Sequence, residues 1–264
     1  MARKRFGQHF LHERGVIDRI LAALNPGPDD RLIEIGPGEG ALTEPLLAQV
    51  EQLSVIEIDR DLIARWQTRA TERDGLEVIA GDALRIDYAA LAARRGGAVR
   101  LVGNLPYNIS SPLLFALLTS QAPIIDMHFM LQKEVVDRMV AGPGSRDYGR
   151  LSVAIAARAE ADLLFDVGPG AFRPPPKVMS SVVRLRPRTP DFVIDDDPLF
   201  DGVVAAAFGQ RRKTLRNALK SYLAAEAIEA CGVDPGQRAE QLAAADFARL
   251  ANAAAQIHGP RGHT

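Results

Sequence analysis

The first hundred residues alternate short apolar runs, rich in β-branched side chains, with longer amphipathic stretches. Strands that alternate with helices in this way are typical of a parallel sheet covered by helices. The prediction is therefore an α/β domain whose sheet is built from the apolar runs. The predicted strands are 32–35, 53–58, 76–80, 100–103 and 128–131, and the predicted helices are 16–24, 41–48, 60–73, 112–118 and 133–140.

Two further strands are predicted at 163–167 and 181–185, on either side of the segment PGAFRPPPKV. The prolines of that segment exclude a helix there. These strands would complete a mostly parallel sheet with an antiparallel tail. The composition changes after residue 186, where PRTP and an acidic stretch precede a region rich in Ala, Leu, Arg and Gln. We predict an α/β domain over 1–187, a linker over 188–197 and a small all-helical domain over 198–264.

Composition places the chain among ordinary globular proteins, with 264 residues, 47% hydrophobic and 25% charged. Its single cysteine, Cys231, has no Cys or His neighbour at metal-ligand spacing, so the sequence supports neither a disulfide scaffold nor a zinc site. No apolar run reaches the roughly 18 residues that a membrane span needs. The start MARKRFGQHF has positive charge but no apolar stretch behind it. We expect a soluble, cytoplasmic protein without membrane association or processing.

The net charge of −1 conceals a strong segregation of charge along the chain. The start MARKR and the stretch 210–220 are basic without any acid, whereas 191–201 is acidic without any base. Each run alone is most simply a solvated face. Two basic runs near opposite ends of the chain could nevertheless meet on one phosphate backbone.

A glycine-rich turn, GPGEGA, follows the first predicted strand of the sheet. Gly36, Gly38 and Ala41 satisfy the dinucleotide fingerprint G-x-G-x-x-G/A, so an NAD enzyme remains an alternative. Glu57 ends the next strand, where an acid accepts hydrogen bonds from ribose hydroxyls in either class of enzyme. The pair indicates a nucleoside site without fixing the reaction.

Asp82 follows the third strand in the sequence GDA. It could accept a hydrogen bond from the amine of a bound adenine, although an aspartate after a strand is commonly a helix cap. Gly36, Glu57 and Asp82 lie at the carboxyl ends of three successive strands. Ligands of open α/β folds collect at this carboxyl edge, so together these residues favour a ligand site.

The tetrapeptide Asn104-Leu105-Pro106-Tyr107 follows the fourth strand and carries the most specific chemistry. An exocyclic adenine amine is a poor nucleophile because its lone pair is delocalised into the ring. The Asn104 side-chain oxygen and the Leu105 carbonyl could draw its N–H groups toward acceptors and free that lone pair. Pro106 restricts the backbone, and Tyr107 offers a ring for stacking. The motif predicts methylation of an adenine amine by positioning, without a general base.

The chain resembles the ribosomal RNA small-subunit dimethyladenosine transferase family (KsgA/RsmA) over nearly its whole length. The resemblance implies a Rossmann-like S-adenosylmethionine-dependent methyltransferase domain with a small helical C-terminal domain. It also implies dimethylation of two adjacent adenosines in the 3′-terminal hairpin loop of 16S ribosomal RNA during ribosome biogenesis. The similar segments are RKRFGQHFL, EIGPGEGALTEPL, VIEIDRDL, GDA, GNLPYNISSPLLF, MHFMLQKEVVDRMVAGPGSRDYGRLSV, FRPPPKVMSSVVRL and QRRKTLRNAL.

The resemblance also implies site residues. It assigns Phe172 to the face of the target adenine opposite Tyr107, although a place in the core is the alternative. His9 stands where the family usually has asparagine, so an imidazole replaces an amide near the cofactor. A metal pair formed by His9 and His12 is disfavoured, since no acid or cysteine is close by. The implied cofactor contacts are His9, Leu11, Gly36, Glu57, Asp82 and Asn104, with the N-terminal segment contributing to that site.

For the substrate, we expect Arg211, Arg212, Lys213 and Arg216 to contact RNA phosphates, assisted by the N-terminal run Arg3, Lys4 and Arg5. Three alternatives stay open. The adenine could belong to DNA or large-subunit RNA, or the protein could act mainly as an assembly checkpoint that binds immature small subunits. An NAD oxidoreductase is the third, although the predicted edge lacks an acid–base residue. We expect a monomer.

Overall fold

The computed structural model describes residues 9–210 and 212–258, which form two compact units. The first unit combines the chain up to Val136 with Ala161–Pro187, and the second combines Asp137–Glu160 with the chain from Arg188 onward. The basic residues Arg3, Lys4, Arg5 and Arg211 lie outside the described residues.

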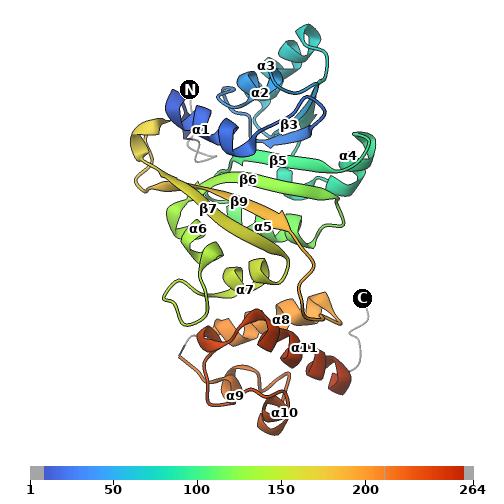
Figure 1. Ribbon diagram of the computed structural model, residues 1–264, viewed down its shortest axis with the longest axis vertical. Coiled ribbons are helices and arrows are strands. Elements are labelled where there is room, and N and C mark those ends of the chain that lie inside the picture. The colour runs from blue at the N-terminus through green and yellow to red at the C-terminus, as the bar shows by residue number, and fades with distance from the viewer. Residues whose placement is uncertain (1–8, 211, 259–264) are drawn as a thin grey trace. The chain divides into compact units, whose positions relative to one another are not determined.

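The first unit contains a seven-stranded sheet with the strand order β4-β3-β2-β5-β6-β9-β7 (Figure 1). The first five strands in this order are parallel, and β9 runs antiparallel to β6. The mostly parallel sheet with an antiparallel strand beyond β6 is therefore confirmed. The strands are β2 Arg31–Ile35, β3 Gln52–Glu57, β4 Leu76–Ala80, β5 Val99–Asn104, β6 Ile124–Gln132, β7 Ala159–Val167 and β9 Ser180–Pro187.

The helices of this part of the chain follow the predicted alternation with the strands. Two short strands, β1 Phe10–Leu11 and β8 Phe172–Arg173, were not predicted and pair antiparallel with each other. The exclusion of helix from the proline-rich segment was wrong at Pro169–Ala171, which forms a 3₁₀ turn, because proline suits the first position of a helix. The helices are α1 Arg14–Leu24, α2 Thr43–Leu47, α3 Arg60–Glu72, the unpredicted α4 Tyr88–Arg94, α5 Ser110–Thr119 and α6 Lys133–Val140.

Helix α1 shows why these residues form a helix and where it packs. The Glu13 carboxylate caps its start by accepting from the Gly15 and Val16 backbone N–H groups. Asn25 ends it in the left-handed conformation at φ 45°. Its buried face, Val16, Ile20 and Leu24, packs in one apolar cluster with residues of β2, β3 and α2.

The amino ends of the central strands are joined by a cluster of charged side chains around Arg100. The Arg100 guanidinium makes two hydrogen bonds to Asp126, at 2.9 and 2.8 Å, and one to Asp30 at 2.7 Å. It also donates to the Leu24 carbonyl at the end of α1. The Arg100 and Asp126 side chains are each 12% exposed, so this cluster is largely removed from water.

The second unit is helical and has its own apolar core, which confirms the predicted C-terminal helical domain. The chain passes from the first unit to the second after Pro187, and residues 137–160 also belong to the second unit. Val153 and Tyr148 are buried in its core, and the Tyr148 hydroxyl donates to the Leu242 carbonyl. Its helices are α7 Arg150–Ala156, α8 Asp197–Gly209, α9 Leu215–Ala218, α10 Ala225–Ala230 and α11 Ala244–His258.

Within the described residues, no helix combines the length and the apolar character that crossing a membrane requires.

Candidate active site

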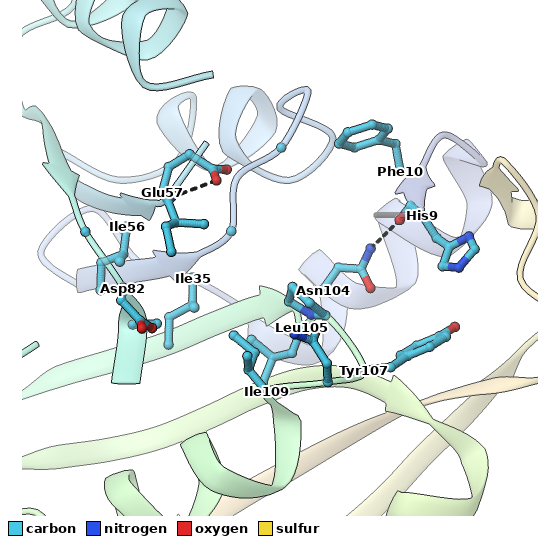
Figure 2. A pocket seen from close by; sticks show the side chains of 17 residues that line it. His9, Phe10, Ile35, Ile56, Glu57, Asp82, Asn104, Leu105, Tyr107 and Ile109 are labelled. Carbon is cyan, nitrogen blue, oxygen red and sulfur yellow. Dashed lines mark hydrogen bonds between the residues drawn. The ribbon is translucent and has the colours of Figure 1, made fainter. Parts of the chain in front are cut away.

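The carboxyl ends of β2, β3 and β5 and the turn after β4 surround a cavity of about 320 Å³. This is the edge at which ligands bind in open α/β sheets, and the volume suits a small molecule. Figure 2 shows Glu57 and Asp82 toward one end of the cavity and His9 and Tyr107 toward the other. The remaining lining residues are Phe10, Ile35, Gly36, Gly38, Ile56, Ile58, Gly81, Ala83, Asn104, Leu105, Pro106, Asn108 and Ile109.

The glycine-rich turn after β2 brings backbone to the edge of the cavity. Gly36 and Gly38 have φ values of +72° and +54°, which disfavour residues with a side chain. A Cβ atom on Gly38 would also lie 3.1 Å from the Phe10 ring. The turn therefore allows a ligand to lie against bare backbone between β2 and the N-terminal segment.

Glu57 is 5% exposed and lines the cavity from the end of β3. Its Oε1 accepts from the backbone N–H groups of Ile58, at 2.8 Å, and Asp59, at 2.9 Å. Burial raises the pKa of Glu57 above its ordinary value, and these N–H groups oppose that rise. The carboxylate is thereby held in one orientation, with acceptor capacity left for two adjacent hydroxyls of a ribose.

Asp82 is both a helix cap and a residue of the cavity wall. Its Oδ1 caps the short 3₁₀ turn Ala83–Arg85 by accepting from the Leu84 backbone N–H at 3.0 Å. The same side chain lines the cavity. Because one oxygen is fixed by the cap, the carboxylate has a defined direction in which to accept from an adenine amine.

Asn104 ends β5 and presents an oriented amide to the cavity. Its Nδ2 donates to the His9 backbone carbonyl at 2.9 Å (Figure 2). This bond uses the donor end of the amide and leaves Oδ1 as an acceptor for a ligand. The next residue is anchored as well, since the Leu105 N–H donates to the Met130 carbonyl at 3.1 Å. Two potential acceptors, the Asn104 Oδ1 and the Leu105 carbonyl, are thus held in consecutive residues at the end of one strand.

Tyr107 is fixed at the same end of the cavity by contacts on both sides. Its hydroxyl lies 3.2 Å from Ser180 Oγ at the start of β9, and its carbonyl accepts from Ser110 Oγ. The His9 ring lies 5.6 Å from the Tyr107 ring, centroid to centroid, with planes inclined by 32°. His9 Nδ1 is 2.7 Å from the Pro174 carbonyl oxygen. An aromatic face is therefore braced beside the Asn104 amide.

Comparison with known proteins places this site in a family. The model of the ribosomal RNA adenine dimethylase family matches residues 1–256. The chain belongs to the ribosomal RNA adenine dimethylase family. It is 57% identical over 252 residues to ribosomal RNA small subunit methyltransferase A of Xanthomonas campestris, covering 95% of each chain. It is 58% identical to the protein of that name from Xanthomonas euvesicatoria, again over 95% of each.

Two solved structures share the fold of this adenine dimethylase. A dimethyladenosine transferase from Plasmodium falciparum superposes with a TM-score of 0.78 at 27% identity, covering 92% of this chain and 96% of that one. The 23S rRNA methyltransferase ErmE superposes with a TM-score of 0.70 at 25% identity, covering 92% and 98%. The fold is thus the Rossmann-like methyltransferase domain followed by C-terminal helices. The shared fold extends to a 23S rRNA methyltransferase, so it does not by itself select the RNA.

The adenine dimethylase is an enzyme whose cofactor is S-adenosylmethionine. The residues present fit that cofactor. Glu57 and Asp82 offer acceptors for ribose hydroxyls and an adenine amine, and Ile35 and Ile56 supply apolar surface for the adenine ring. The glycine turn lets the methionine portion of the cofactor lie close to the protein backbone. An NAD oxidoreductase is excluded by the family.

The structure does not bring Phe172 of the dimethylase to the cavity. The side chain is 2% exposed and belongs to the apolar cluster that contains Val16 and Val182. Phe172 pairs with Leu11 across β1 and β8. The ring therefore packs in the core, the alternative that the sequence left open, and a contact with the target adenine stays a prediction. Leu11, predicted to contact the cofactor, is 6% exposed and lines a second, smaller cavity beside the main one.

The basic residues predicted to bind RNA lie in the second unit of the dimethylase. Arg212 and Lys213 follow α8, and Arg216 lies on α9. All three side chains are exposed. They surround Leu215, which is fully buried in the core of that unit and fixes the segment that carries them.

Sequence reasoning missed several residues that shape the dimethylase site. Phe10 and Ile56 line the cavity, and Ser180 braces Tyr107, yet none of them belongs to a polar motif after a strand. Gly103 is the fourth residue that was not identified from the sequence. A Cβ atom there would lie 2.5 Å from the Ile35 carbonyl oxygen on the neighbouring strand β2. The signal was present in the sequence, because Gly103 directly precedes Asn104.

We expect Gly103→Ala to reduce methyl transfer by the dimethylase at least about 10-fold, because separating β5 from β2 moves Asn104 away from its productive position. Gly97→Ala is a control for the loss of a glycine, since a Cβ atom there meets no neighbour within 4 Å. Gly97 has φ +140°, so its replacement is expected to affect stability and not the rate per folded molecule. Initial rates normalised to the folded fraction measure both. Equal rates for Gly103→Ala and the parent enzyme would contradict the prediction.

Proposed function

We propose that this enzyme dimethylates two adjacent adenosines in the 3′-terminal hairpin loop of small-subunit (16S) ribosomal RNA during ribosome biogenesis. The observation that carries the adenine chemistry is the Asn104 amide, whose donor end is engaged by the His9 carbonyl and whose acceptor end is left for the substrate. The choice of the small subunit is supported by the relatives that share 57–58% identity and bear that name. The enzyme acts in the cytoplasm, as a monomer.

Asn104 and Leu105 raise the nucleophilicity of the target amine. Each N–H of the amine donates to one acceptor, the Asn104 Oδ1 or the Leu105 carbonyl. The hydrogen bonds draw the amine out of conjugation with the ring, so that its lone pair points away from the two acceptors. These acceptors are fixed before the substrate arrives, because Nδ2 of Asn104 and the N–H of Leu105 are already hydrogen bonded.

Bound S-adenosylmethionine supplies an electrophilic methyl group on a sulfonium. Glu57 and Asp82 hold the adenosine portion of the cofactor at one end of the cavity. Asn104 holds the amine near the other end, and the rate then depends on the in-line approach of the two. The nitrogen becomes strongly acidic as the new bond forms, so its proton passes to solvent without a protein base.

Tyr107 supplies the aromatic face on which the target adenine stacks. A base removed from its own stack loses a few kcal/mol, and one aromatic contact recovers about 1 to 3 kcal/mol. The contact between the Tyr107 hydroxyl and Ser180 holds the ring in place for this purpose. The His9 ring beside it extends the same wall of the cavity.

Arg212, Lys213 and Arg216, together with Arg211 and the basic start of the chain, contact the phosphates of the RNA. Replacing Arg212, Lys213 and Arg216 together with glutamine is expected to weaken RNA binding and to reduce the slope of log K against log salt by about 1 per lost phosphate contact. The measurement is a binding titration at several salt concentrations. An unchanged slope would remove these residues from the RNA interface.

The decisive experiment is methyl transfer from labelled S-adenosylmethionine to small ribosomal subunits isolated from a strain that lacks this methylation. Nucleoside analysis of the RNA is expected to give N6,N6-dimethyladenosine. Incorporation into large-subunit RNA or DNA, with none into small subunits, would retain the amine chemistry and overturn the proposed target. No incorporation into any of these substrates would overturn the proposed reaction.

A further inference from the structure

Three arginine side chains gather at the edge of the sheet opposite the cavity. Arg31 is the first residue of β2, and Arg94 and Arg95 lie at the end of α4. The Arg31 Nε donates to the Arg95 carbonyl at 2.7 Å. The cavity lies where β2 ends, at Gly36, so roughly 16 Å of extended strand separates Arg31 from it. The arginine cluster, Arg31, Arg94 and Arg95, is therefore outside the cofactor site.

Among the described residues, one carboxylate is paired with the arginine cluster. Glu77, on β4, accepts from Arg94 Nη2 at 2.6 Å, and its other oxygen lies 3.7 Å from Arg95 Nη1. That oxygen also accepts from Ser54 Oγ at 2.8 Å. Arg31 makes no ion pair within the part of the chain that the structure describes. Three guanidinium groups thus share one carboxylate, which leaves an excess of positive charge.

Arg95 is the least satisfied member of the cluster. Its side chain is 13% exposed, and its Nε and Nη2 are fully buried without a hydrogen-bond partner in the described ranges. Buried donors are normally paired with acceptors, and an unpaired charged donor costs more than a neutral one. Burial lowers the pKa of Arg95, Glu77 opposes that shift, and the positive charges of Arg94 and Arg31 add to it. The surroundings of Arg95 therefore favour a further negative charge.

The turn after α4 leaves room beside the exposed part of the cluster. At Gly96, with φ +89°, a Cβ atom would lie 3.5 Å from Arg31 Nε and 3.7 Å from Arg31 Nη2. A side chain at this position would therefore lie against the Arg31 guanidinium, whereas glycine leaves it open. The Arg94 side chain is 59% exposed, so it can turn from Glu77 to a ligand while Ser54 still holds Glu77. Arg94 and the partly exposed Arg31 can thus be reached by a small anion from solvent.

We propose that the arginine cluster is an anion-binding site separate from the catalytic cavity, and that it takes a phosphate group. Arg31 and Arg94 bind the phosphate oxygens, and the buried charge of Arg95 attracts the anion electrostatically. Guanidinium groups match phosphate oxygens in paired hydrogen bonds, and a phosphate has enough oxygens to bridge groups from two segments of the chain. Its charge also offsets the positive excess that Glu77 leaves.

The phosphate can come from either of two sources, the backbone of the substrate RNA or free inorganic phosphate. For the RNA, the inference rests on the proposed function, because it makes the edge opposite the cavity a further contact with the small subunit. For free phosphate, it does not depend on the reaction. A phosphate contact with RNA at this edge would add to the salt dependence of substrate binding.

The first test is the unfolding temperature in millimolar phosphate, compared with chloride at equal ionic strength. Phosphate is expected to raise this temperature for the parent, because a ligand of the folded state stabilises it, and the concentration dependence gives the affinity. Arg31→Gln and Arg94→Gln are each expected to weaken phosphate binding about 10-fold, as for a lost hydrogen bond to a charged group. Arg14→Gln, which removes an 89% exposed arginine of α1, is the matched control and should keep the parental affinity.

Arg95→Met separates anion binding from a structural role. The variant removes a buried charge with unpaired donors, so without phosphate it is expected to unfold at a higher temperature than the parent. It is also expected to respond to phosphate less than the parent does. A structural role alone would make Arg95→Met less stable. Parental phosphate affinity in both Arg31→Gln and Arg94→Gln would overturn the inference, as would a parent with no saturable response to phosphate.

Binding of small ribosomal subunits at several salt concentrations identifies the source of the phosphate. If it is RNA, the double variant Arg31→Gln with Arg94→Gln is expected to bind subunits more weakly and to reduce the slope of log K against log salt by about 1. Unchanged subunit binding with weakened phosphate binding assigns the site to free phosphate. A parent that binds phosphate yet methylates neither RNA nor DNA would remove the proposed function and retain the anion site.

Discussion

Asn104→Ala is expected to lower the rate of methyl transfer by about 100-fold to 1,000-fold, the usual cost of removing one preorganised hydrogen-bonding group from a reacting centre. The variant loses the Oδ1 acceptor for the amine and also the Nδ2 bond to the His9 carbonyl. The backbone of residue 104 remains, so affinity for S-adenosylhomocysteine should change by much less than the rate. Single-turnover rates and calorimetric binding separate the two quantities.

Asn104→Asp tests the orientation of the amide in the same assay. The aspartate keeps an acceptor of the same shape but places a carboxylate oxygen against the His9 carbonyl oxygen, where the amide donates in the parent. We expect a rate between those of Asn104→Ala and the parent. A variant Asn104→Ala that transfers methyl groups at the parental rate would remove this residue from catalysis. If it is inactive yet binds small subunits normally, binding and catalysis are separate roles of the protein.

Arg100→Met is expected to reduce the free energy of unfolding by about 3 to 5 kcal/mol, the usual cost of removing one partner of a buried ion pair. The Asp126 carboxylate, 12% exposed, would lose both of its bonds to the guanidinium, and Asp30 and the Leu24 carbonyl would each lose one. Chemical denaturation followed by circular dichroism measures the change.

The double variant Arg100→Met with Asp126→Leu is the matched control, because it removes the stranded charge together with its partner. It should recover much of the lost stability, as buried ion pairs replaced by apolar side chains often do. A loss of unfolding free energy below about 1 kcal/mol for Arg100→Met alone would contradict the prediction. It would show that water reaches Asp126 and that these ion pairs contribute no more than exposed ones.

The sheet and much of the site could be predicted because their signals are local. Each of the seven predicted strands exists, since the short length of the apolar runs and their β-branched residues favour a strand over a buried helix. Glu57, Asp82 and Asn104 were placed correctly at the cavity because parallel strands bring the residues after their carboxyl ends to one edge. This rule needs no knowledge of side-chain packing.

The direction of the Phe172 side chain could not be predicted from the local sequence. The segment FRPPPKV fixes an extended backbone, and in such a backbone neighbouring side chains point to opposite sides. Which side faces the core depends on the pairing of β8 with β1, which is distant in sequence. A two-residue strand carries no alternation from which that pairing could be predicted.

Residues 137–160 are a second example, at the level of the domains. Val153 and Ala157 form an ordinary apolar helix face, which fits either an α/β core or a helical one. The choice is made by distant contacts, such as the hydrogen bond from Tyr148 to the Leu242 carbonyl. A boundary near residue 187 was easier to predict, because the composition changes abruptly there.

The pairing of β1 with β8 has a consequence for synthesis of the protein. Phe10 pairs with Arg173, so the ribosome must add 163 residues after Phe10 before the partner of the His9 segment has been synthesised. At 5 to 20 residues per second, translation takes roughly 8 to 30 s to supply them. Until then the segment that supplies His9 and Phe10 to the cavity lacks its partner strand. We therefore expect cofactor to stabilise nearly complete chains more than shorter ones, because only they hold His9 and Phe10 in place.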